Sequence, residues 1–183
     1  MHITTSIEKW PKTLFIDTEP RAEGLHLSTL ISRIMADAGM TPKAGGFADI
    51  ELTAEIGLLW EDVLSLTMGN KYAVRPPQIC EDGIWMSPDG IADDPEGKYP
   101  LVVEEYKATW LSANKCPTGV YKYMAQVKAY CRALGTLCTV MRIFHLNGDY
   151  RGSGPLYKVS RIEFTPQELD ENWAMILRYR DKI

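Results

Sequence analysis

Two acidic residues and a lysine lie close enough in this 183-residue chain to form a metal-dependent hydrolytic site. Asp89 follows a proline in a Ser-Pro-Asp-Gly turn, and Glu105 and Lys107 lie two residues apart in the apolar segment 101–107. Because side chains alternate along a strand, Glu105 and Lys107 share one face, whereas Glu104 points to the other, towards solvent or a helix. Two converging carboxylates suit a hard divalent cation, and Lys107 lies where it could orient a water molecule beside that ion.

Each of these residues also has a structural explanation. Aspartate is common in Pro-Asp-Gly turns for conformational reasons alone. Glu105 and Lys107 could form an ion pair on an edge strand, although an acid and a lysine on a strand that should be buried favour a functional use.

Four short motifs together resemble a known nuclease superfamily. Pro88-Asp89 followed by Glu105-Tyr106-Lys107 resembles the PD-(D/E)xK signature. The segment 57–61 resembles the upstream G-x-x-x-E helix motif, and the segment 126–130 resembles the Q-x-x-x-Y helix motif of the branch that contains lambda exonuclease and the RecB nuclease domain. The motifs occur in the family's order, and the resemblance covers about residues 28 to 164.

The resemblance implies a restriction-endonuclease-like core and a Mg²⁺- or Mn²⁺-dependent deoxyribonuclease. In that family pattern Asp89, Glu105 and the Tyr106 carbonyl bind the metal, and Glu61 holds it or a second ion through water. The motif of Gln126 and Tyr130 implies contacts near the scissile phosphate or the catalytic Lys107.

The branch further implies a phage-type recombination or repair exonuclease that acts from DNA ends. Ser32 and Arg33 resemble the helix position that holds a terminal phosphate. Lysines in the segment around the site are further candidates for DNA binding: Lys115, Lys122 and Lys128. A single-strand annealing recombinase is a candidate partner, and a homo-oligomer is left open.

Two alternatives keep the same core. One is a structure-selective or nicking endonuclease, and the other is a noncatalytic module that binds DNA ends or a recombinase. The intact Asp89, Glu105 and Lys107 argue against the noncatalytic module, because a retired site would be free to lose them.

The composition is typical of a globular enzyme, with 45% hydrophobic and 24% charged residues. No apolar run approaches the roughly 20 residues that a membrane-spanning helix needs, and the N-terminus lacks the pattern of a secretory signal, so we expect a cytoplasmic protein of a bacterial or phage-infected cell. The net charge of −4 counts against a nucleic-acid enzyme. The four cysteines have no C-x-x-C spacing, which favours reduced thiols over a zinc site.

The patterning predicts one α/β domain over residues 1–183, with a mixed central sheet flanked by helices and a poorly determined leader at 1–23. Helices are expected at 28–38, 52–67 and 120–134, and strands at 72–74, 83–86, 90–92, 101–108, 137–146 and 156–164. A last helix should begin at Thr165, with Pro166 in its first turn and Glu168 completing a capping box.

Overall fold

The computed structural model describes residues 21–40, 50–68, 73–152 and 154–182. The predicted loop at 41–47 and all but the last three residues of the predicted leader lie outside these ranges. At the centre is a four-stranded mixed sheet in the order β4-β5-β6-β7, in which β5 and β6 are parallel and the two outer pairs are antiparallel. Its strands are β4 (Gly90–Ala92), β5 (Val102–Thr109), β6 (Cys138–His145) and β7 (Leu156–Glu163).

A second, three-stranded sheet has the order β1-β3-β2, with strands β1 (Leu25–His26), β2 (Ile79–Glu81) and β3 (Ile84–Met86). The helices are α1 (Leu27–Asp37), α2 (Ile50–Val63), α3 (Tyr121–Ala133) and α4 (Pro166–Arg180). A π-helical turn, η1 (Leu64–Met68), continues α2, and a short 3-10 turn, η2 (Pro117–Gly119), precedes α3. Among the described helices, none combines the length and the apolar character that a membrane crossing requires.

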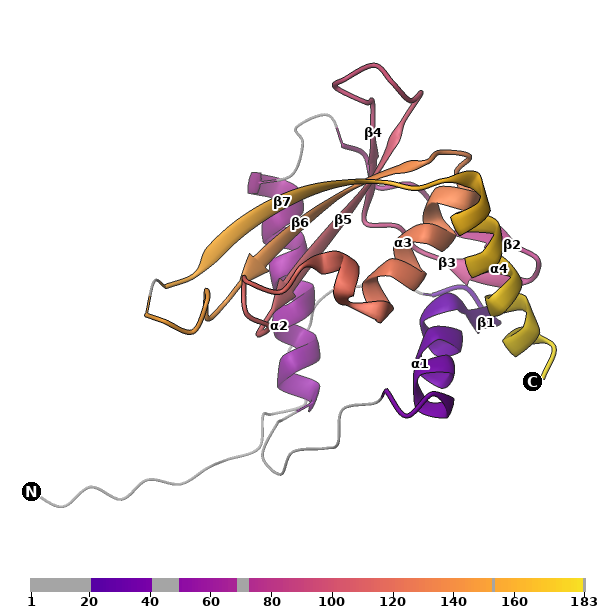
Figure 1. The fold of residues 1–183 in the computed structure, drawn as a ribbon, viewed down its shortest axis with the longest axis horizontal. Coiled ribbons are helices and arrows are strands. Elements are labelled where there is room, and N and C mark those ends of the chain that lie inside the picture. Colours follow the sequence, from indigo (N-terminus) through magenta and orange to yellow (C-terminus); the bar gives the residue numbers. More distant parts are fainter. Residues whose placement is uncertain (1–20, 41–49, 69–72, 153, 183) are drawn as a thin grey trace, which may run out of the picture.

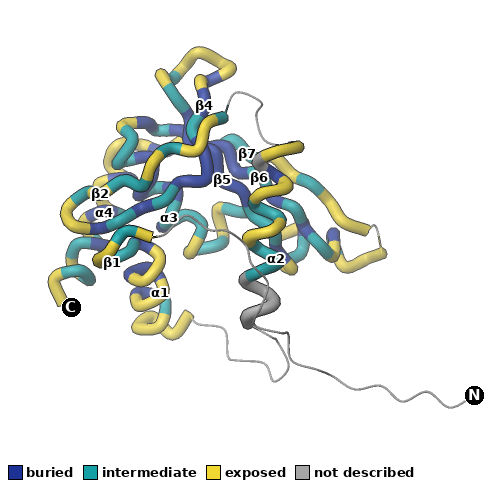
Figure 2. Tube along the Cα trace, turned by 180° about the vertical axis from the view of Figure 1, so that it is seen from behind, coloured by how far each residue is buried: buried dark blue, intermediate teal, exposed yellow. Residues whose placement is uncertain are grey.

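The two faces of the central sheet are covered differently. Val103, Met141 and Ile143 pack into the main core together with α1, α3 and α4. On the opposite face, Trp60 of α2 stacks on Phe144 of β6, with ring centroids 4.4 Å apart. Figure 1 shows α1, α3 and α4 grouped together and α2 apart from them, and the buried stretch along β5 and β6 lies at the centre of the molecule in Figure 2.

The start of α4 forms as its sequence predicts. Glu168 donates its backbone N–H to the Thr165 hydroxyl at 3.2 Å, and the Thr165 N–H donates to the Glu168 carboxylate at 2.9 Å. Pro166 occupies the first turn, where no backbone donor is needed. This reciprocal cap fixes where α4 begins, so that Leu169, Trp173 and Ile176 on one face are buried against the core.

Most predicted elements are present, and the mixed α/β fold is confirmed. The differences lie in short strands: β1 and β2 were not predicted, and the described part of the predicted strand at 72–74 forms one bridge, Val74 to Ile91. The two- and three-residue strands carry too few residues for a period of two to be recognised, and the pairing of β1 with β3 joins positions far apart in the sequence.

The expectation for Glu104 is only half right. It points away from Glu105, but its side chain is 1% exposed rather than in solvent. Arg142, on the neighbouring strand β6, donates to both Glu104 oxygens, at 2.6 Å and 2.9 Å. Glu104 is therefore neutralised by a forked arginine contact on the side of the sheet opposite to Glu105.

Glu104→Ala should destabilise the fold by about 3 kcal/mol or more, because it leaves the Arg142 guanidinium without its partner in a largely buried position. Lys98→Ala is the matched control, since Lys98 pairs with Glu163 at the surface and its loss should change stability by less than about 1 kcal/mol. Chemical denaturation of both variants measures the difference. Equal, small losses would show that the buried pair does not stabilise the sheet.

Candidate metal-dependent active site

The hairpin of β4 and β5 places Asp89 beside the strand that carries Glu105. Gly90 lies opposite Glu104 in the register, and a Cβ at Gly90 would lie 3.2 Å from the Glu104 Cβ, so a larger residue would push the strands apart. The close approach lets Asp89 Oδ2 accept the backbone N–H of Tyr106 at 2.7 Å. The Asp89 carboxylate is therefore fixed against the middle of β5.

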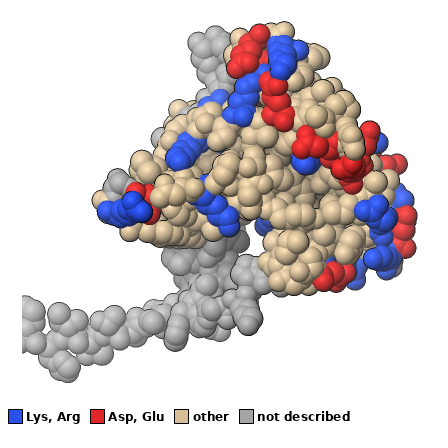
Figure 3. All heavy atoms as spheres, viewed as in Figure 1, with Lys and Arg blue, Asp and Glu red and all other residues tan. Residues whose placement is uncertain are grey.

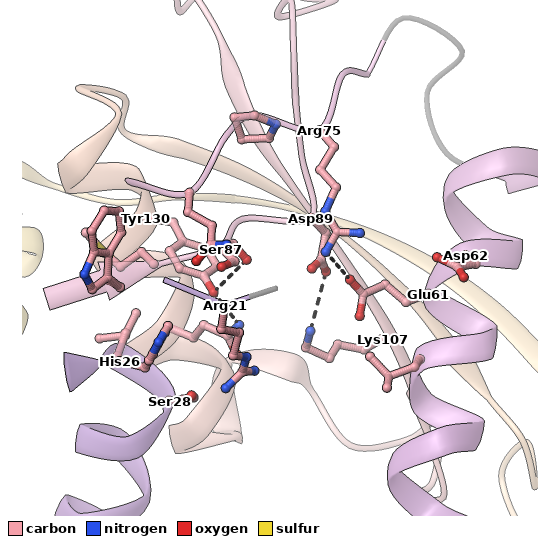
Figure 4. Close-up of a pocket in the computed structure, with 17 residues that line it drawn as sticks. Arg21, His26, Ser28, Glu61, Asp62, Arg75, Ser87, Asp89, Lys107 and Tyr130 are labelled. Carbon is pink, nitrogen blue, oxygen red and sulfur yellow. Dashed lines mark hydrogen bonds and ion pairs between the residues drawn. The ribbon is translucent and has the colours of Figure 1, made fainter. Parts of the chain in front are cut away.

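The Lys107 ammonium connects the two carboxylates. Its Nζ lies 2.5 Å from Glu105 Oε1 and 3.6 Å from Asp89 Oδ2, and it donates to the Tyr106 carbonyl at 3.0 Å. Figure 4 shows Asp89 and Lys107 pointing towards each other. The structure thus brings together the predicted residues Asp89, Glu105, Lys107 and the Tyr106 backbone.

Glu61 joins this group from the opposite side. The stacking of Trp60 on Phe144 anchors α2, and the next residue, Glu61, points towards Asp89 in Figure 4. Burial, together with the charge of Asp89 and a side-chain hydrogen bond to it, raises the pKa of Glu61 to about 7. Arg75, which the sequence did not single out, lies 3.5 Å from Glu61 Oε1.

Glu105 is the most constrained charge of the site. Its side chain is 1% exposed, and apart from the Lys107 ion pair neither carboxylate oxygen has a hydrogen-bond partner in the described part of the chain. Burial and the charge of Asp89 raise the pKa of Glu105. Burial alone would lower the pKa of Lys107, but the charges of Asp89 and Glu105 outweigh it and hold that pKa well above its usual range.

Gln126 and Tyr130 support the turn that carries Asp89. Gln126 Nε2 donates to the Tyr130 hydroxyl at 2.8 Å, and that hydroxyl donates to the Ser87 carbonyl at 3.1 Å. Burial raises the pKa of Tyr130, so the phenol stays protonated and able to donate. The i, i+4 pair on α3 therefore holds the backbone two residues before Asp89, a role that the motif alone did not specify.

A cleft of about 490 Å³ is lined by Glu61, Asp89, Lys107, Gln126 and Tyr130, whereas the buried Glu105 does not line it and contacts Lys107. In Figure 4, Glu61, Asp62, Asp89 and Lys107 lie on one side of it, and Arg21, His26 and Ser28 lie on the other. The second group comes from the start of β1 and α1 and was not predicted, because its place in the site depends on the unexpected pairing of β1 with β3.

The oxygen atoms of the cleft fit a hard divalent cation. Within the described ranges no three His, Cys, Asp or Glu side chains gather closely enough to form a complete metal site by themselves. However, Asp89 and Glu105 converge on one point, the Tyr106 carbonyl faces the same ammonium, and buried Glu105 oxygens lack donors. Carboxylate and carbonyl oxygens with positions left for water are what Mg²⁺ and Mn²⁺ accept.

The predicted DNA-binding residues are not part of this cleft. Ser32 and Arg33 are exposed on α1, and the Ser32 hydroxyl donates to the Ser28 carbonyl at 2.8 Å. Lys122 is exposed on α3, whereas Lys115 lines a separate hollow of about 310 Å³.

Some of the cations near the site are engaged by acids of α4. Lys128 lies 3.6 Å from Glu168 Oε1, and Arg132 pairs with Glu81 and Asp170. In the view of Figure 3, Asp and Glu gather mainly over the upper hairpin and the right half, whereas the left half carries mainly Lys and Arg. The negative net charge is thus unevenly distributed.

Comparison with solved structures identifies the class of fold. The chain is similar to an alkaline exonuclease, LHK-Exo, from Laribacter hongkongensis, with a TM-score of 0.54, 14% identity, and 87% of each chain covered. LHK-Exo in complex with dAMP gives a TM-score of 0.51 at 15% identity, again with 87% of each chain covered. A phage-related exonuclease from Haemophilus somnus 129PT gives 0.46 at 13% identity, covering 85% of this chain and 81% of that one.

The restriction-endonuclease-like fold predicted from the motifs is therefore confirmed, together with the structural similarity to this group of exonucleases. No protein-family model matches the sequence, and no curated protein matches it.

Stabilisation by Mn²⁺ should increase between pH 6 and pH 8. Folding raises the pKa of Glu61 from 4.5 to about 7 and that of Glu105 from 4.5 to about 8. Without metal, the stability that these two protonated acids contribute therefore falls as the pH rises from about 4.5 through 8. A cation must displace those protons, so it binds better, and raises Tm more, at the higher pH. Thermal unfolding with and without Mn²⁺ tests this, with Glu105→Gln as the control that should lose most of the shift. An equal rise in Tm on adding Mn²⁺ at both pH values, or a wild-type rise in Glu105→Gln, would contradict the proposed cation site.

Proposed function

We propose that this protein is a Mg²⁺- or Mn²⁺-dependent nuclease that hydrolyses phosphodiester bonds of DNA, and that it acts as an exonuclease from DNA ends. The observation that carries the proposal is the convergence of Asp89 and Glu105 on the Lys107 ammonium, beside a cleft that Asp89 and Lys107 line. A purely structural ion pair would need one carboxylate per ammonium, whereas here two carboxylates share one lysine and Glu61 adds a third acid. The excess of acids supports a cation site.

Asp89, Glu105 and the Tyr106 carbonyl would hold the cation, and Glu61 would hold it or a second ion through water. Bound there, the cation supplies charge that polarises the scissile phosphate and makes a water more acidic. Without it, Lys107 is the counter-ion that keeps both carboxylates in place.

Lys107 has a second role once substrate is bound. Its pKa lies well above the usual value, so it stays an ammonium and acts as a hydrogen-bond donor rather than a base. From the centre of the site it can orient the attacking water in line with the bond that breaks, and stabilise the negative charge that develops on the phosphate. Gln126 and Tyr130 are positioning residues, because they hold the turn of Asp89 through Ser87.

Three features support DNA as the substrate and its ends as the point of attack. The fold is that of an enzyme described as an alkaline exonuclease, and a structure of that enzyme contains dAMP. The wall of the cleft that faces the acids carries Arg21, which precedes β1, and Arg33 is exposed on α1. We propose Ser32 and Arg33 as contacts to a terminal phosphate, and Lys115, Lys122 and Lys128 as contacts to the DNA backbone.

The Arg33→Ala variant tests the contact to the terminal phosphate. It should digest DNA with phosphorylated ends more slowly than the wild type and digest DNA with hydroxyl ends at the wild-type rate. A single-strand annealing recombinase and a homo-oligomer stay predictions from the sequence.

Lys107→Ala should reduce the cleavage of linear duplex DNA in Mg²⁺ by roughly a hundredfold or more, because it removes the charge that orients the water and stabilises the phosphate. Lys98→Ala should cleave at the wild-type rate, since that exposed lysine lies on the surface and pairs with Glu163. End-labelled linear DNA and closed circular DNA, each incubated with the wild type and both variants, measure the effect.

Wild-type cleavage by Lys107→Ala would overturn the assignment of the site. Efficient linearisation of the closed circle by the wild type would replace the exonuclease with a nicking endonuclease on the same core.

A further inference from the structure

Trp85 forms part of the cleft wall without being used by the proposed hydrolysis. It lies in the middle of β3, between Ile84 and Met86, which are 0% and 1% exposed in the main core. Trp85 itself is less buried than these two neighbours, and it lines the cleft together with Met86. A large aromatic ring therefore faces the same space as Asp89 and Lys107.

The indole is held in place by the backbone of the preceding segment. Gly24 has a φ of +125°, and a Cβ there would lie 3.2 Å from Trp85 Cδ1 and 3.3 Å from Nε1. Only glycine combines this backbone conformation with such close contact. His26 lies opposite Trp85 in the β1–β3 register, and its Nε2 is hydrogen-bonded to the Ala22 carbonyl at 2.8 Å. The wall around Trp85 is thus preformed rather than loosely packed.

The surroundings of Trp85 differ from the acidic side of the cleft. Gln78 also lines the cleft, and its Oε1 accepts the Ala22 N–H at 3.1 Å, which ties the segment before β1 to the residues before β2. An aromatic surface that lines the cleft together with Arg21, and faces the same space as Asp89 and Lys107, suits a flat ring attached to a phosphate.

We propose that Trp85 is the stacking platform for a nucleobase of the bound strand, next to the phosphate at Asp89, Glu105 and Lys107. This inference rests on the proposed function, because it takes the ligand of the cleft to be a nucleic acid. Stacking on an aromatic side chain tolerates any base, since every base has a π face, and it requires the base to be unpaired from its partner strand. The cleft would therefore bind a single-stranded or locally unpaired terminus rather than an intact base pair.

The test compares ligands that differ only in the base. Thymidine 5′-monophosphate and 2-deoxyribose 5-phosphate are titrated into the full chain by calorimetry, and neither contains a phosphodiester bond that could be cleaved. The wild type should bind the nucleotide roughly tenfold more tightly than the sugar phosphate. Trp85→Leu should reduce this ratio to about one while leaving the affinity for the sugar phosphate within about twofold, and Trp85→Phe should retain most of it.

Gly24→Ala is a second variant that leaves the indole present but displaced. Like Trp85→Leu, it should lower the ratio of the affinity for the nucleotide to that for the sugar phosphate. Circular dichroism and Tm report whether each variant is folded. In DNA cleavage, Trp85→Leu should raise KM for single-stranded oligonucleotides more than it lowers kcat, which a general loss of folding would not do.

The two proposals fail in different ways. A wild-type protein that binds both ligands equally, or a folded Trp85→Leu that keeps the full ratio, overturns the stacking platform even when linear DNA is cleaved and Lys107→Ala is inactive. A base-dependent ratio that Trp85→Leu abolishes supports the platform even when no DNA is cleaved, in which case the hydrolysis alone is wrong.

Discussion

The interaction on which the site depends is the sharing of one lysine by two carboxylates, one on a buried strand and one in a turn. Glu105 and Lys107 lie on the same face of β5, and the hairpin brings Asp89 to the same ammonium. Burying a carboxylate is costly unless its charge is compensated, and one ammonium cannot compensate two acids, even before Glu61 is counted. Burial first, and then the charge of Asp89, raise the pKa of Glu61 and of Glu105, and a bound divalent cation would favour the ionised form of both.

The rest of the fold keeps that arrangement rigid. Gly90 allows β4 to approach β5, the chain from Gln126 through Tyr130 holds the Ser87 carbonyl, and the Trp60–Phe144 stack anchors α2 so that Glu61 reaches Asp89. On the far face, Glu104 is neutralised by Arg142. Two neighbouring glutamates on one strand therefore have different surroundings: Glu104 is paired through both oxygens with Arg142, and Glu105 has only the ion pair with Lys107 among the described residues.

The parts of the fold that follow from local patterns could be predicted. The period of two along β5 separated Glu104 from Glu105, and the capping box located the start of α4 within one residue. The resemblance supplied the order of the motifs. The structure places Glu61, Asp89, Lys107, Gln126 and Tyr130 around one cleft, and Glu105 contacts Lys107. What these residues do chemically is a proposal that the geometry supports.

The parts that depend on contacts between distant segments could not be predicted. The burial of Glu104 requires Arg142, 38 positions away, and the far wall of the cleft requires β1 to pair with β3. Likewise, no periodicity shows that Lys128 and Arg132 pair with acids on neighbouring elements instead of facing solvent. Trp85 lines the cleft as well, beside the wall that the pairing of β1 with β3 builds.

The most direct test of the cation site is the anomalous diffraction of crystals soaked in Mn²⁺. We predict a strong peak within about 2.0–2.6 Å of oxygens from both Asp89 and Glu105, with the Lys107 ammonium moved away from its present contact with Glu105. A saturated crystal with no peak between these two carboxylates, and with Lys107 still bridging them, would contradict the account.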